Sequence, residues 1–563
     1  MPLKPDKVLI TAALLYANGA LHFGHLAGAY LAADAYARFE RMRGSDVLFL
    51  SGSDEYGVAI ALSAELAGRS PVEHVDLYHK SNQELFSKLN FSFNHYSRTS
   101  WEGHRIPVLQ YFNDLQENGF VEKRATEQLY SPEEKRFLAD RYVIGGCPRC
   151  RFDAARGDEC PKCGASYEAT DLIAPRSRLS NASLTKKTTT HWFLLLDKLA
   201  PKVNEWIATK RWKPTVLNFL KHYLDNPLPR AITRDGTWGV PVPGEEGKVF
   251  YVWFEAPIGY ISAAIEWAEK SGNPLAWQEY WFDPKTKLVQ FIGKDNIYFH
   301  GIFFPAMTMG QNLPYKIVDE LPANEFLNLE GRQFSKSDNW TIDLTDILTR
   351  YSPDQLRYTL AANAPESSDA EFTFKDLQLR CNGELVGKYG NLANRSLVFA
   401  SAKCGGVIPP ATLQPRDLLF LDQLAALTAQ VQEAYSSFRL RRVCQLIMEI
   451  SSLGNAYFDE KKPWATAKHE ETLPDMQTTI HCSLLALKAL AVVAKPIMPQ
   501  TTEKLWALLG LDPSLHTHWD EALNLPLTVG HPLPTPTPLF SKISDEEIAA
   551  ELAKLHGGGN YLG

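Results

Sequence analysis

The sequence predicts an α/β fold with a doubly wound, parallel, Rossmann-type sheet, which an inserted module interrupts and an all-α helical bundle follows. Three observations carry this prediction. Strand and helix patterns alternate at the beginning of the chain and again after about residue 249, clustered cysteines lie between these stretches, and only helical patterns occur after about residue 380. A chain of 563 residues also exceeds the ~250–300 residues of a single core, so several domains are expected.

Residues 1–118 have the pattern of the first half of the sheet domain. Val8–Leu14 is a short apolar run followed by the turn-forming pair Asn18-Gly19, and residues 46–51 form a second strand-like run. Helical spacing of apolar residues is found in three stretches: 26–43, 57–68 and 71–90. This alternation is typical of a parallel sheet covered by helices.

The inserted module is predicted over residues 119–228, where the sequence becomes irregular and rich in turns. Two Cys-x-x-Cys pairs occur there, nine residues apart: Cys147, Cys150, Cys160 and Cys163. Two thiolates in one tight turn chelate a metal ion, and two such turns complete a tetrahedron. We expect one structural Zn²⁺, because four protein ligands leave no open position, and we expect it to hold an insertion too small and irregular to build its own core.

The second half of the sheet domain is predicted over residues 229–322, followed by a shorter region at 323–380. Strands are expected at 249–254 and 288–292, and helices at 258–270 and 300–309. Residues 381–531 follow a 3/4 apolar spacing and predict an α-helical bundle. The last stretch, 532–563, reads as a proline-rich linker, a short helix around 545–555 and a glycine-rich tail.

Two short sequence motifs indicate a nucleotide site. His22-Phe23-Gly24-His25 follows the first strand at a helix start, where unsatisfied N–H groups and the positive dipole end favour phosphate. Both imidazoles share one face, and Gly24 leaves room for the nucleotide. Phe334-Ser335-Lys336-Ser337 offers an ammonium and two hydroxyl groups that can follow a departing pyrophosphate. Lys294, after a strand, is a further phosphate candidate.

Sequence composition indicates the cellular compartment of the protein and the kinds of partner it has. The N-terminus lacks a signal-peptide pattern and no uninterrupted apolar run reaches ~18 residues, so a cytoplasmic protein without a membrane partner is expected. The remaining four cysteines are scattered, as in a reducing compartment. A net charge of −7 does not indicate a polyanion partner, so any RNA contact must use local basic patches.

The two motifs, in this order, resemble the HIGH and KMSKS signatures of class I aminoacyl-tRNA synthetases. Further stretches are similar to the methionyl-tRNA synthetase family in its form with a single zinc knuckle. They follow the family's order from about residue 8 to about 470: 13–19, 52–57, 137–141, 232–235, 251–260, 293–300 and 391–395. So many ordered matches are far more specific than a lone HxGH, which also occurs in small adenylyltransferases.

The resemblance implies a methionine–tRNA ligase. Such an enzyme activates methionine with ATP to methionyl-adenylate and transfers it to the 3′-terminal adenosine of tRNA(Met), at the 2′-hydroxyl first. It implies L-methionine, ATP with Mg²⁺, and tRNA(Met) as partners. It also implies a connective-peptide domain at 119–228, a stem-contact region at 323–380 and an anticodon-binding domain at 381–531. Because no tRNA-binding or dimerising extension is seen after the bundle, a monomer is expected.

The resemblance also assigns roles to individual residues. The catalytic candidates are His22, His25, Lys336 and Lys294. ATP would be bound by His22, Gly24, His25, Ser335, Lys336 and Ser337. Methionine would be bound by Leu14, Tyr16, Asp54, Trp253, Ala256, Pro257, Tyr260 and His300, with Asp54 taking the ammonium and Tyr260 or His300 offering a polar hydrogen near the sulfur. The anticodon would be read by Asn391, Arg395 and Trp464.

Some positions depart from the family pattern. Gln333 and Asp338 make the KMSKS-like loop less basic than usual, which is the ground for the alternative of a non-catalytic tRNA-binding paralogue. The synthetase remains the prediction because His22, His25, Lys336 and Asp54 are all present. Leucyl, isoleucyl and valyl enzymes fit less well, because an insertion of about 110 residues leaves no room for their editing domain. A cysteinyl enzyme would carry dispersed zinc ligands in its active site, whereas these cysteines are compact.

Overall fold

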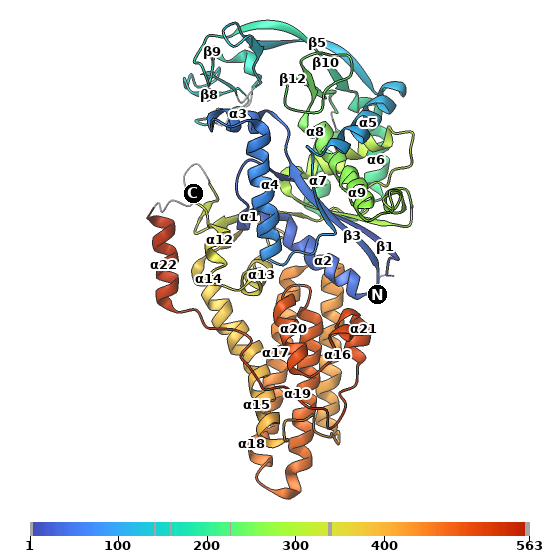
Figure 1. Cartoon of the computed structure of the whole chain (residues 1–563), viewed down its shortest axis with the longest axis vertical. Helices are drawn as coiled ribbons and strands as arrows, with labels where there is room; N and C mark the ends of the chain where they lie inside the picture. Colours follow the sequence, from blue (N-terminus) through green and yellow to red (C-terminus); the bar gives the residue numbers. More distant parts are fainter. Residues whose placement is uncertain are drawn as a thin grey trace.

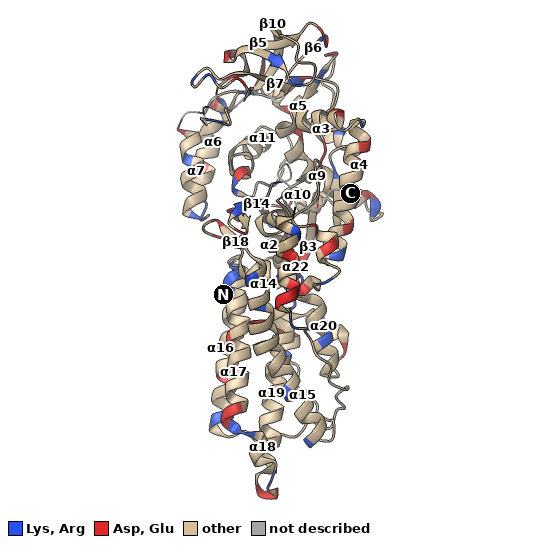
Figure 2. Cartoon of the chain, turned by 90° about the vertical axis from the view of Figure 1, so that its left-hand side faces the viewer, with Lys and Arg blue, Asp and Glu red and all other residues tan. Residues whose placement is uncertain are grey.

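The computed structural model describes residues 4–557, apart from 140–141, 158–159, 164, 166, 226 and 336–339. The molecule is elongated, with the inserted module at one end, the parallel sheet in the middle and the helical bundle at the other end (Figure 1). Basic and acidic residues are interspersed along its length in the view of Figure 2. This distribution agrees with a chain whose net charge is only −7.

The central sheet is parallel and, within the described residues, has six strands in the order β15-β14-β1-β3, with β2 and β4 also pairing with β3. These strands are β1 (Lys7–Ala12), β2 (Leu15–Tyr16), β3 (Asp46–Asp54), β4 (His95–Arg98), β14 (Lys287–Gly293) and β15 (Ala323–Asn324). Because the strand order reverses at β1, the crevice beyond its carboxyl end is the expected ligand site. The predicted doubly wound sheet is confirmed.

Helices cover this sheet and connect its strands. They are α1 (Phe23–His25), α2 (Leu31–Met42), α3 (Val58–Leu66), α4 (Pro71–Lys88), α5 (Arg105–Glu117), α8 (Val252–Glu255), α9 (Gly259–Lys270), α10 (Gln278–Trp281) and α11 (Phe304–Met309). Wide π turns at Leu26–Tyr30 and Phe299–Phe303 introduce α2 and α11. Such turns are frequent at functional sites, and both lie beside motifs singled out in the sequence.

One predicted strand is partly wrong. Residues 249–254 were expected to be extended, but β13 ends at Phe250 (Lys248–Phe250) and Val252 begins the short helix α8. An apolar run of this length is compatible with a buried strand or a buried helix, because periodicity alone does not separate them. The backbone therefore turns at Tyr251 and sends the next side chains toward α9 and the end of β3.

The inserted module is more ordered than its sequence suggested. It contains β5 (Val121–Ser131), β6 (Arg136–Phe137), β7 (Val143–Gly146), β8 (Ala155–Arg156), β9 (Ile173–Ser177), β10 (Thr185–Leu194), β11 (Arg230–Ala231), α6 (Leu196–Ala208) and α7 (Pro214–Leu224). β5 and β10 form an antiparallel ribbon ten residue pairs long. The expectation that this module has no core is wrong, since Leu129, Leu138 and Val143 are buried together beside Cys147 and Cys160.

The stem region links the sheet to the bundle. Its elements are β16 (Leu327–Leu329), β17 (Arg332–Gln333), β18 (Ala370–Phe372), α12 (Leu344–Ile347), α13 (Pro353–Ala362), α14 (Phe374–Leu379) and a π segment at Arg380–Gly390. Arg357 on α13 is buried and its Nη2 donates to Asp34 Oδ2 on α2 at 2.6 Å. Phe39 on α2 also stacks on Tyr435 of the bundle at 5.0 Å between ring centroids. Sheet and bundle therefore share one continuous core.

The predicted bundle is confirmed. Its helices are α15 (Asn391–Lys403), α16 (Pro415–Ser436), α17 (Leu440–Lys461), α18 (Pro463–Thr466), α19 (Leu473–Ala494), α20 (Pro499–Leu508) and α21 (Trp519–Asn524). The stretch Glu470–Ala494 is long and apolar enough to cross a membrane, but 83% of its most apolar window is buried inside the protein. It is the central helix of the bundle, packed by α15, α16, α17 and α20.

The C-terminal segment runs back along the bundle as an extended strap (Figure 1). Its backbone is held at both ends, where Leu533 N donates to Gly406 O at 2.8 Å and Asn382 Nδ2 donates to Ile543 O at 2.8 Å. The predicted last helix is α22 (Asp545–His556), which packs on α14 and pairs Glu551 with Arg350. The glycine-rich tail after Gly557 lies outside the described residues.

Candidate functional site

The two histidines lie together at the carboxyl end of the sheet. The His22 and His25 rings stack with centroids 3.6 Å apart, and the His22 backbone N–H donates to His25 Nδ1 at 3.2 Å. Since Nδ1 of His25 is the acceptor, the proton of the neutral ring resides on Nε2. His22 begins α1, so the predicted placement of both rings at a helix start is observed.

Phe334 brings the second motif to the first. Its ring lies on His22, with centroids 4.8 Å apart and an interplanar angle of 6°. A Cβ atom at Gly24 would lie 3.0 Å from the His22 ring and 3.3 Å from Phe334 Cδ2. Only glycine therefore fits between these rings without displacing them. Ser335, next to Phe334, exchanges a pair of backbone hydrogen bonds with Trp340, at 3.0 and 2.8 Å. Lys336 and Ser337 lie outside the described residues.

Lys294, the other phosphate candidate, follows β14 directly. Its Nζ is 2.8 Å from Glu325 and 2.7 Å from Asp369, and these two carboxylates hold the pKa of Lys294 above its usual value even though its burial opposes this. Contact with a phosphate would require the ammonium to exchange one of these partners. Lys294 thus lies at the carboxyl end of β14, where its positive charge is balanced by Glu325 and Asp369.

Aromatic rings from two segments line the predicted amino-acid pocket. Trp253 stacks on Phe299, with centroids 3.6 Å apart and an angle of 7°. Tyr260 Oη lies 2.8 Å from His300 Nε2, and His300 Nδ1 lies 3.0 Å from the Asn296 carbonyl oxygen. A carbonyl only accepts, so Nδ1 carries the proton of His300 and Tyr260 donates to Nε2. Burial lowers the pKa of His300 to about 4, which keeps this ring neutral.

This proton arrangement corrects one expectation. Both polar hydrogens of the Tyr260–His300 pair are used within the protein, so neither points to a substrate sulfur in this state. The other predicted methionine contacts lie at or near the start of α9. Leu14 Cδ1 would lie 2.9 Å from a Cβ at Gly259, and Ala256 and Pro257 are buried in the turn before α9.

Asp54 is the acidic residue of this pocket. It ends β3 opposite Tyr16 of β2, is 7% exposed, and its Oδ1 has no hydrogen-bond partner among the described residues. Burial, together with the neighbouring charge of Glu55, raises the pKa of Asp54 well above its usual value. A cationic group bound here would offset both the cost of burying the Asp54 charge and the repulsion from Glu55.

Two buried residues beside the pocket were missed from the sequence. Glu255, next to Trp253, is fully buried and its Oε2 lies 2.8 Å from His104 Nε2. Glu255 stands inside the motif-like stretch 251–260 and carried a signal of its own, an acid in an otherwise apolar run. His104 lies 151 residues earlier in an unremarkable stretch, so only the fold connects the two.

The four predicted metal ligands are brought together. The sulfur atoms of Cys147, Cys150, Cys160 and Cys163 all lie within 4.8 Å of one another. Cys147 and Cys163 are separated by 3.8 Å and Cys150 and Cys160 by 3.6 Å. A tetrahedron with Zn–S bonds of about 2.3 Å has S···S edges of about 3.8 Å, so the geometry fits zinc. Backbone N–H groups of Arg149 and Cys150 also point to Cys147 Sγ at 3.4 Å each, as thiolate ligands require.

The predicted anticodon residues gather at the far end of the bundle. Arg395 on α15 lies over the Phe458 ring at 4.1 Å and over the Trp464 ring at 5.9 Å, and pairs with Asp459 at 2.6 Å. Asn391, one turn earlier, donates to Asn455 Oδ1 at 2.8 Å. Trp464 is 45% exposed. An amide, a guanidinium and an exposed indole on one surface suit unstacked bases.

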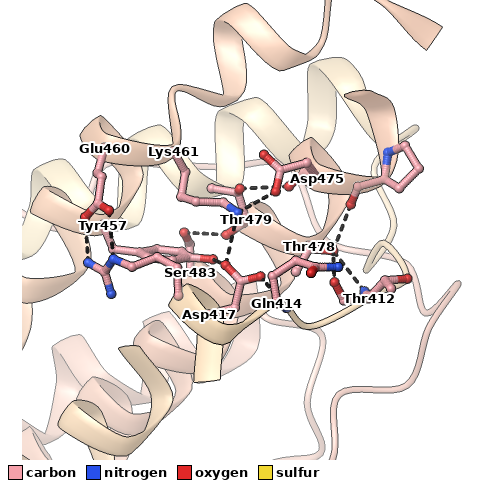
Figure 3. Close-up of polar contacts among 12 residues, drawn as sticks. Thr412, Gln414, Asp417, Tyr457, Glu460, Lys461, Asp475, Thr478, Thr479 and Ser483 are labelled. Atoms are coloured by element: carbon pink, nitrogen blue, oxygen red, sulfur yellow. Dashed lines mark hydrogen bonds and ion pairs between the residues drawn. The ribbon is translucent and has the colours of Figure 1, made fainter. Parts of the chain in front are cut away.

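A buried polar network fixes the turn that carries Trp464. Lys461, at the end of α17, pairs with Asp417 of α16 at 3.1 Å and with Asp475 of α19, and Tyr457 donates to Asp417 at 2.7 Å (Figure 3). Lys462 then adopts a left-handed conformation with φ of 47°, after which α18 begins. Three helices therefore determine where the indole is presented.

Comparison with known proteins agrees with this geometry. Residues 8–397 match the family model described as tRNA synthetases class I (M), which defines the chain as a class I tRNA synthetase. Residues 409–560 match the anticodon binding domain of methionyl tRNA ligase. The chain belongs to the methionine–tRNA ligase family.

Curated relatives cover nearly the whole chain. The methionine–tRNA ligase of Protochlamydia amoebophila is 56% identical over 98% of this chain and 79% of its own length. That of Chlamydia trachomatis serovar L2b is 48% identical over 92% of this chain and 96% of its own. Among solved structures, the methionyl-tRNA synthetase of Mycobacterium tuberculosis in complex with methionyl-adenylate superimposes with a TM-score of 0.80 over 95% of this chain and 99% of its own, at 24% identity. This last similarity supports the fold.

Proposed function

We infer that this protein is a methionine–tRNA ligase that activates methionine with ATP and transfers it to the 3′-terminal adenosine of tRNA(Met). Membership of the family over both of its domains supports the overall reaction. The observation that carries the assignment of the reaction site is the stack of Phe334 on His22, which joins two motifs more than 300 residues apart at the switch point of the sheet.

In the first half-reaction the methionine carboxylate attacks the α-phosphorus of ATP, and pyrophosphate departs. The carboxylate is already a nucleophile, so the protein has to align the reactants and stabilise charge on the phosphate oxygens. We assign this work to His22 and His25, with protonated ring nitrogens at a helix N-terminus, and to Lys336 in the following loop. ATP would enter with Mg²⁺, which neutralises phosphate oxygens.

The amino-acid pocket would recognise the thioether by shape and dispersion. Trp253 supplies an aromatic wall held by Phe299, and the Tyr260–His300 pair closes the pocket with its own hydrogens satisfied. Asp54 would accept the α-ammonium. Such a pocket separates near-isosteres by only ~1–3 kcal/mol, so homocysteine is expected to be activated at more than a thousandth of the methionine rate.

In the second half-reaction the 2′-hydroxyl of the terminal adenosine takes the methionyl group from the adenylate. We propose that Asn391, Arg395 and Trp464 select tRNA(Met) by reading the CAU anticodon at the far end of the bundle. Their proximity, and the exposure of the indole, support this role. We further propose that the cysteine cluster binds one structural Zn²⁺ and that the enzyme acts as a cytoplasmic monomer.

The test is ATP–pyrophosphate exchange with each of the twenty amino acids and homocysteine, followed by charging of tRNA(Met). We expect exchange with methionine, loss of exchange in Lys336→Ala and a strong reduction in His22→Ala. Folded, metal-loaded protein that supports no exchange with any amino acid would refute the assignment. The chain would then be a tRNA-binding paralogue, with Gln333 and Asp338 as the residues to revert.

A further inference from the structure

The side chain of Glu255 lies at the amino-acid pocket but has no role in the reaction described above. It stands between Trp253 and Pro257, two predicted methionine contacts, and both Glu255 and His104 are 0% exposed. Glu255 Oε2 is 2.8 Å from His104 Nε2, whereas Oε1 is buried without a partner among the described residues. An ionised carboxylate left in this state would be strongly penalised.

The hydrogen bonds around His104 limit how protons can be distributed over Ser262, His104 and Glu255. The single hydroxyl hydrogen of Ser262 is within reach of two acceptors, the Ile258 carbonyl oxygen at 3.1 Å and His104 Nδ1 at 2.5 Å. When that hydrogen is donated to Ile258, His104 Nδ1 is the donor of its contact with Ser262 Oγ. The remaining contact, between His104 Nε2 and Glu255 Oε2, needs one further proton. In this arrangement Glu255 and His104 together carry no net charge. In the other, Ser262 donates to Nδ1 and His104 donates from Nε2 to an ionised Glu255, whose Oε1 is then a buried charged oxygen without a partner among the described residues.

The surroundings favour that proton on the carboxyl group. Burial lowers the pKa of His104 to about 3, and burial followed by the charge of Asp54 raises the pKa of Glu255 well above its usual value. The titratable groups that act on Glu255 are Asp54 on β3, His104 before α5, and Tyr56 after β3. None of these is a fixed cation. Burial and the charge of Glu55 raise the pKa of Asp54 as well, but Asp54 accepts the backbone N–H of Tyr56, and a bound α-ammonium would favour its ionised form further.

We propose that Glu255 is held as a neutral carboxylic acid that donates its proton to His104. In this arrangement the pair positions the pocket wall at residues 253–257 and leaves Asp54 as the one charged carboxylate for the substrate ammonium. The inference rests on the proposed function and extends it to a positioning pair. His104 also lies beside Gly259, since its Cε1 is 4.0 Å from the position that a Cβ would take there, and Leu14 Cδ1 is 2.9 Å from the same position. Displacing His104 therefore moves two sides of the pocket.

The proposal predicts different effects for variants of the two acids. Gln has the shape of a protonated Glu and can donate its amide N–H to His104 Nε2, so Glu255→Gln should restore most of what Glu255→Ala loses. In methionine-dependent exchange, we expect Glu255→Ala and His104→Ala to raise the KM for methionine by about tenfold or more, and Glu255→Gln to stay within about threefold. The pH profile of kcat/KM between pH 6 and 9 should be the same for Glu255→Gln and the unaltered protein.

Asp54→Asn is the contrasting variant, with an expected rise in methionine KM of about a hundredfold because it removes the charge that pairs with the ammonium. If Glu255→Gln raises the KM as much as Asp54→Asn does, Glu255 is an ionised second ligand and the proposal is overturned. If Glu255→Ala has no effect, the positioning role is overturned. Absence of exchange in the unaltered protein would instead refute the proposed function, so the two failures are distinguishable.

A second measurement does not depend on activity. The infrared spectrum of the full chain at pH 8 should contain the C=O stretch of a protonated carboxylic acid. That band should be absent from Glu255→Gln and retained in Glu269→Gln, which changes an exposed acid on α9. Its retention in Glu255→Gln would show that Glu255 is not the protonated acid. If Glu255→Gln does not fold, the absence of the band from the unaltered protein overturns the proposal equally.

Discussion

Replacing Gly24 by alanine would test whether the stacked rings of His22 and Phe334 belong to the adenylation site. The new methyl group would lie 3.0 Å from the His22 ring and 3.3 Å from Phe334 Cδ2. Ordinary carbon contacts are about 3.5–4.0 Å, so His22 must move by roughly 0.5–1 Å. A displacement of this size at a group that aligns reactants costs up to about a hundredfold in rate.

We therefore expect Gly24→Ala to lower kcat for ATP–pyrophosphate exchange by about 10–100-fold, with the KM for methionine changed by less than about threefold. The KM for methionine is expected to change little because the new methyl group contacts His22 and Phe334 and not the aromatic residues of the predicted methionine pocket. The measurement is steady-state exchange at saturating methionine over a range of ATP concentrations. Circular dichroism should confirm that the variant remains folded.

Gly28→Ala is the matched control. It lies one turn further along the same helical segment, and nothing is within 4 Å of the position that its Cβ would take. We expect it to retain exchange activity and to gain roughly 0.5–1 kcal/mol of stability from the better helix former. Gly24→Ala with unaltered kcat, or Gly28→Ala equally impaired, would refute the argument that crowding of His22 is what matters.

Four further outcomes are expected. Metal analysis of protein purified without chelator should find one zinc per chain, and Cys147→Ser should reduce both the zinc content and the melting temperature; well under one zinc per chain would contradict the Cys₄ assignment. Asp54→Asn should raise the KM for methionine about a hundredfold while leaving the KM for ATP nearly unchanged, and an equal rise in both would argue for general disorder of the site. Arg395→Ala should lower tRNA(Met) charging by at least about tenfold and leave pyrophosphate exchange intact, so loss of exchange would refute a role confined to tRNA. His516 stacks on Trp506 at 4.4 Å, and burial lowers its pKa to about 4, so below about pH 6.5 the unfolded chain binds a proton that the folded chain does not bind. The free energy of unfolding should therefore be unaffected by His516 above pH 6.5 and should fall by up to about 1.4 kcal/mol per pH unit as the pH decreases toward 4. In urea unfolding, His516→Gln should show a smaller loss of stability over this pH range.

Features that depend on local pattern could be predicted from the sequence. The alternation of short apolar runs with stretches of helical spacing predicted the parallel sheet, because the periodicity of apolar residues in a strand or helix depends only on residues close together in the sequence. The paired Cys-x-x-Cys turns predicted a four-sulfur cluster because each pair is fixed by its own turn. The meeting of the two nucleotide motifs required the resemblance to a family, since nothing local joins His22 to Phe334.

The features that were missed depend on tertiary contact. Helix α8 places Trp253 on the distant Phe299, and the ribbon of β5 and β10 pairs residues 55 to 73 positions apart. Tyr260 and His300 were expected to offer a hydrogen to the substrate, but the Asn296 carbonyl fixes the tautomer and uses both protons. Hydrogen-bond direction in a buried site follows from its neighbours in space and cannot be read from residue type.

The returning C-terminal strap gives the bundle two attachments to the stem. The chain enters the bundle through the π segment at Arg380–Gly390 and comes back through residues 532–544 to α22. The last residue of α22, His556, has its ring 5.4 Å from the ring of Trp340, the backbone partner of Ser335. Together with the core that the sheet and the bundle share, two connections restrict the movement of the bundle relative to the sheet more than one connection would. The strap therefore adds a second covalent connection between the bundle and the region at 323–380, and its last helix carries that connection as far as Trp340.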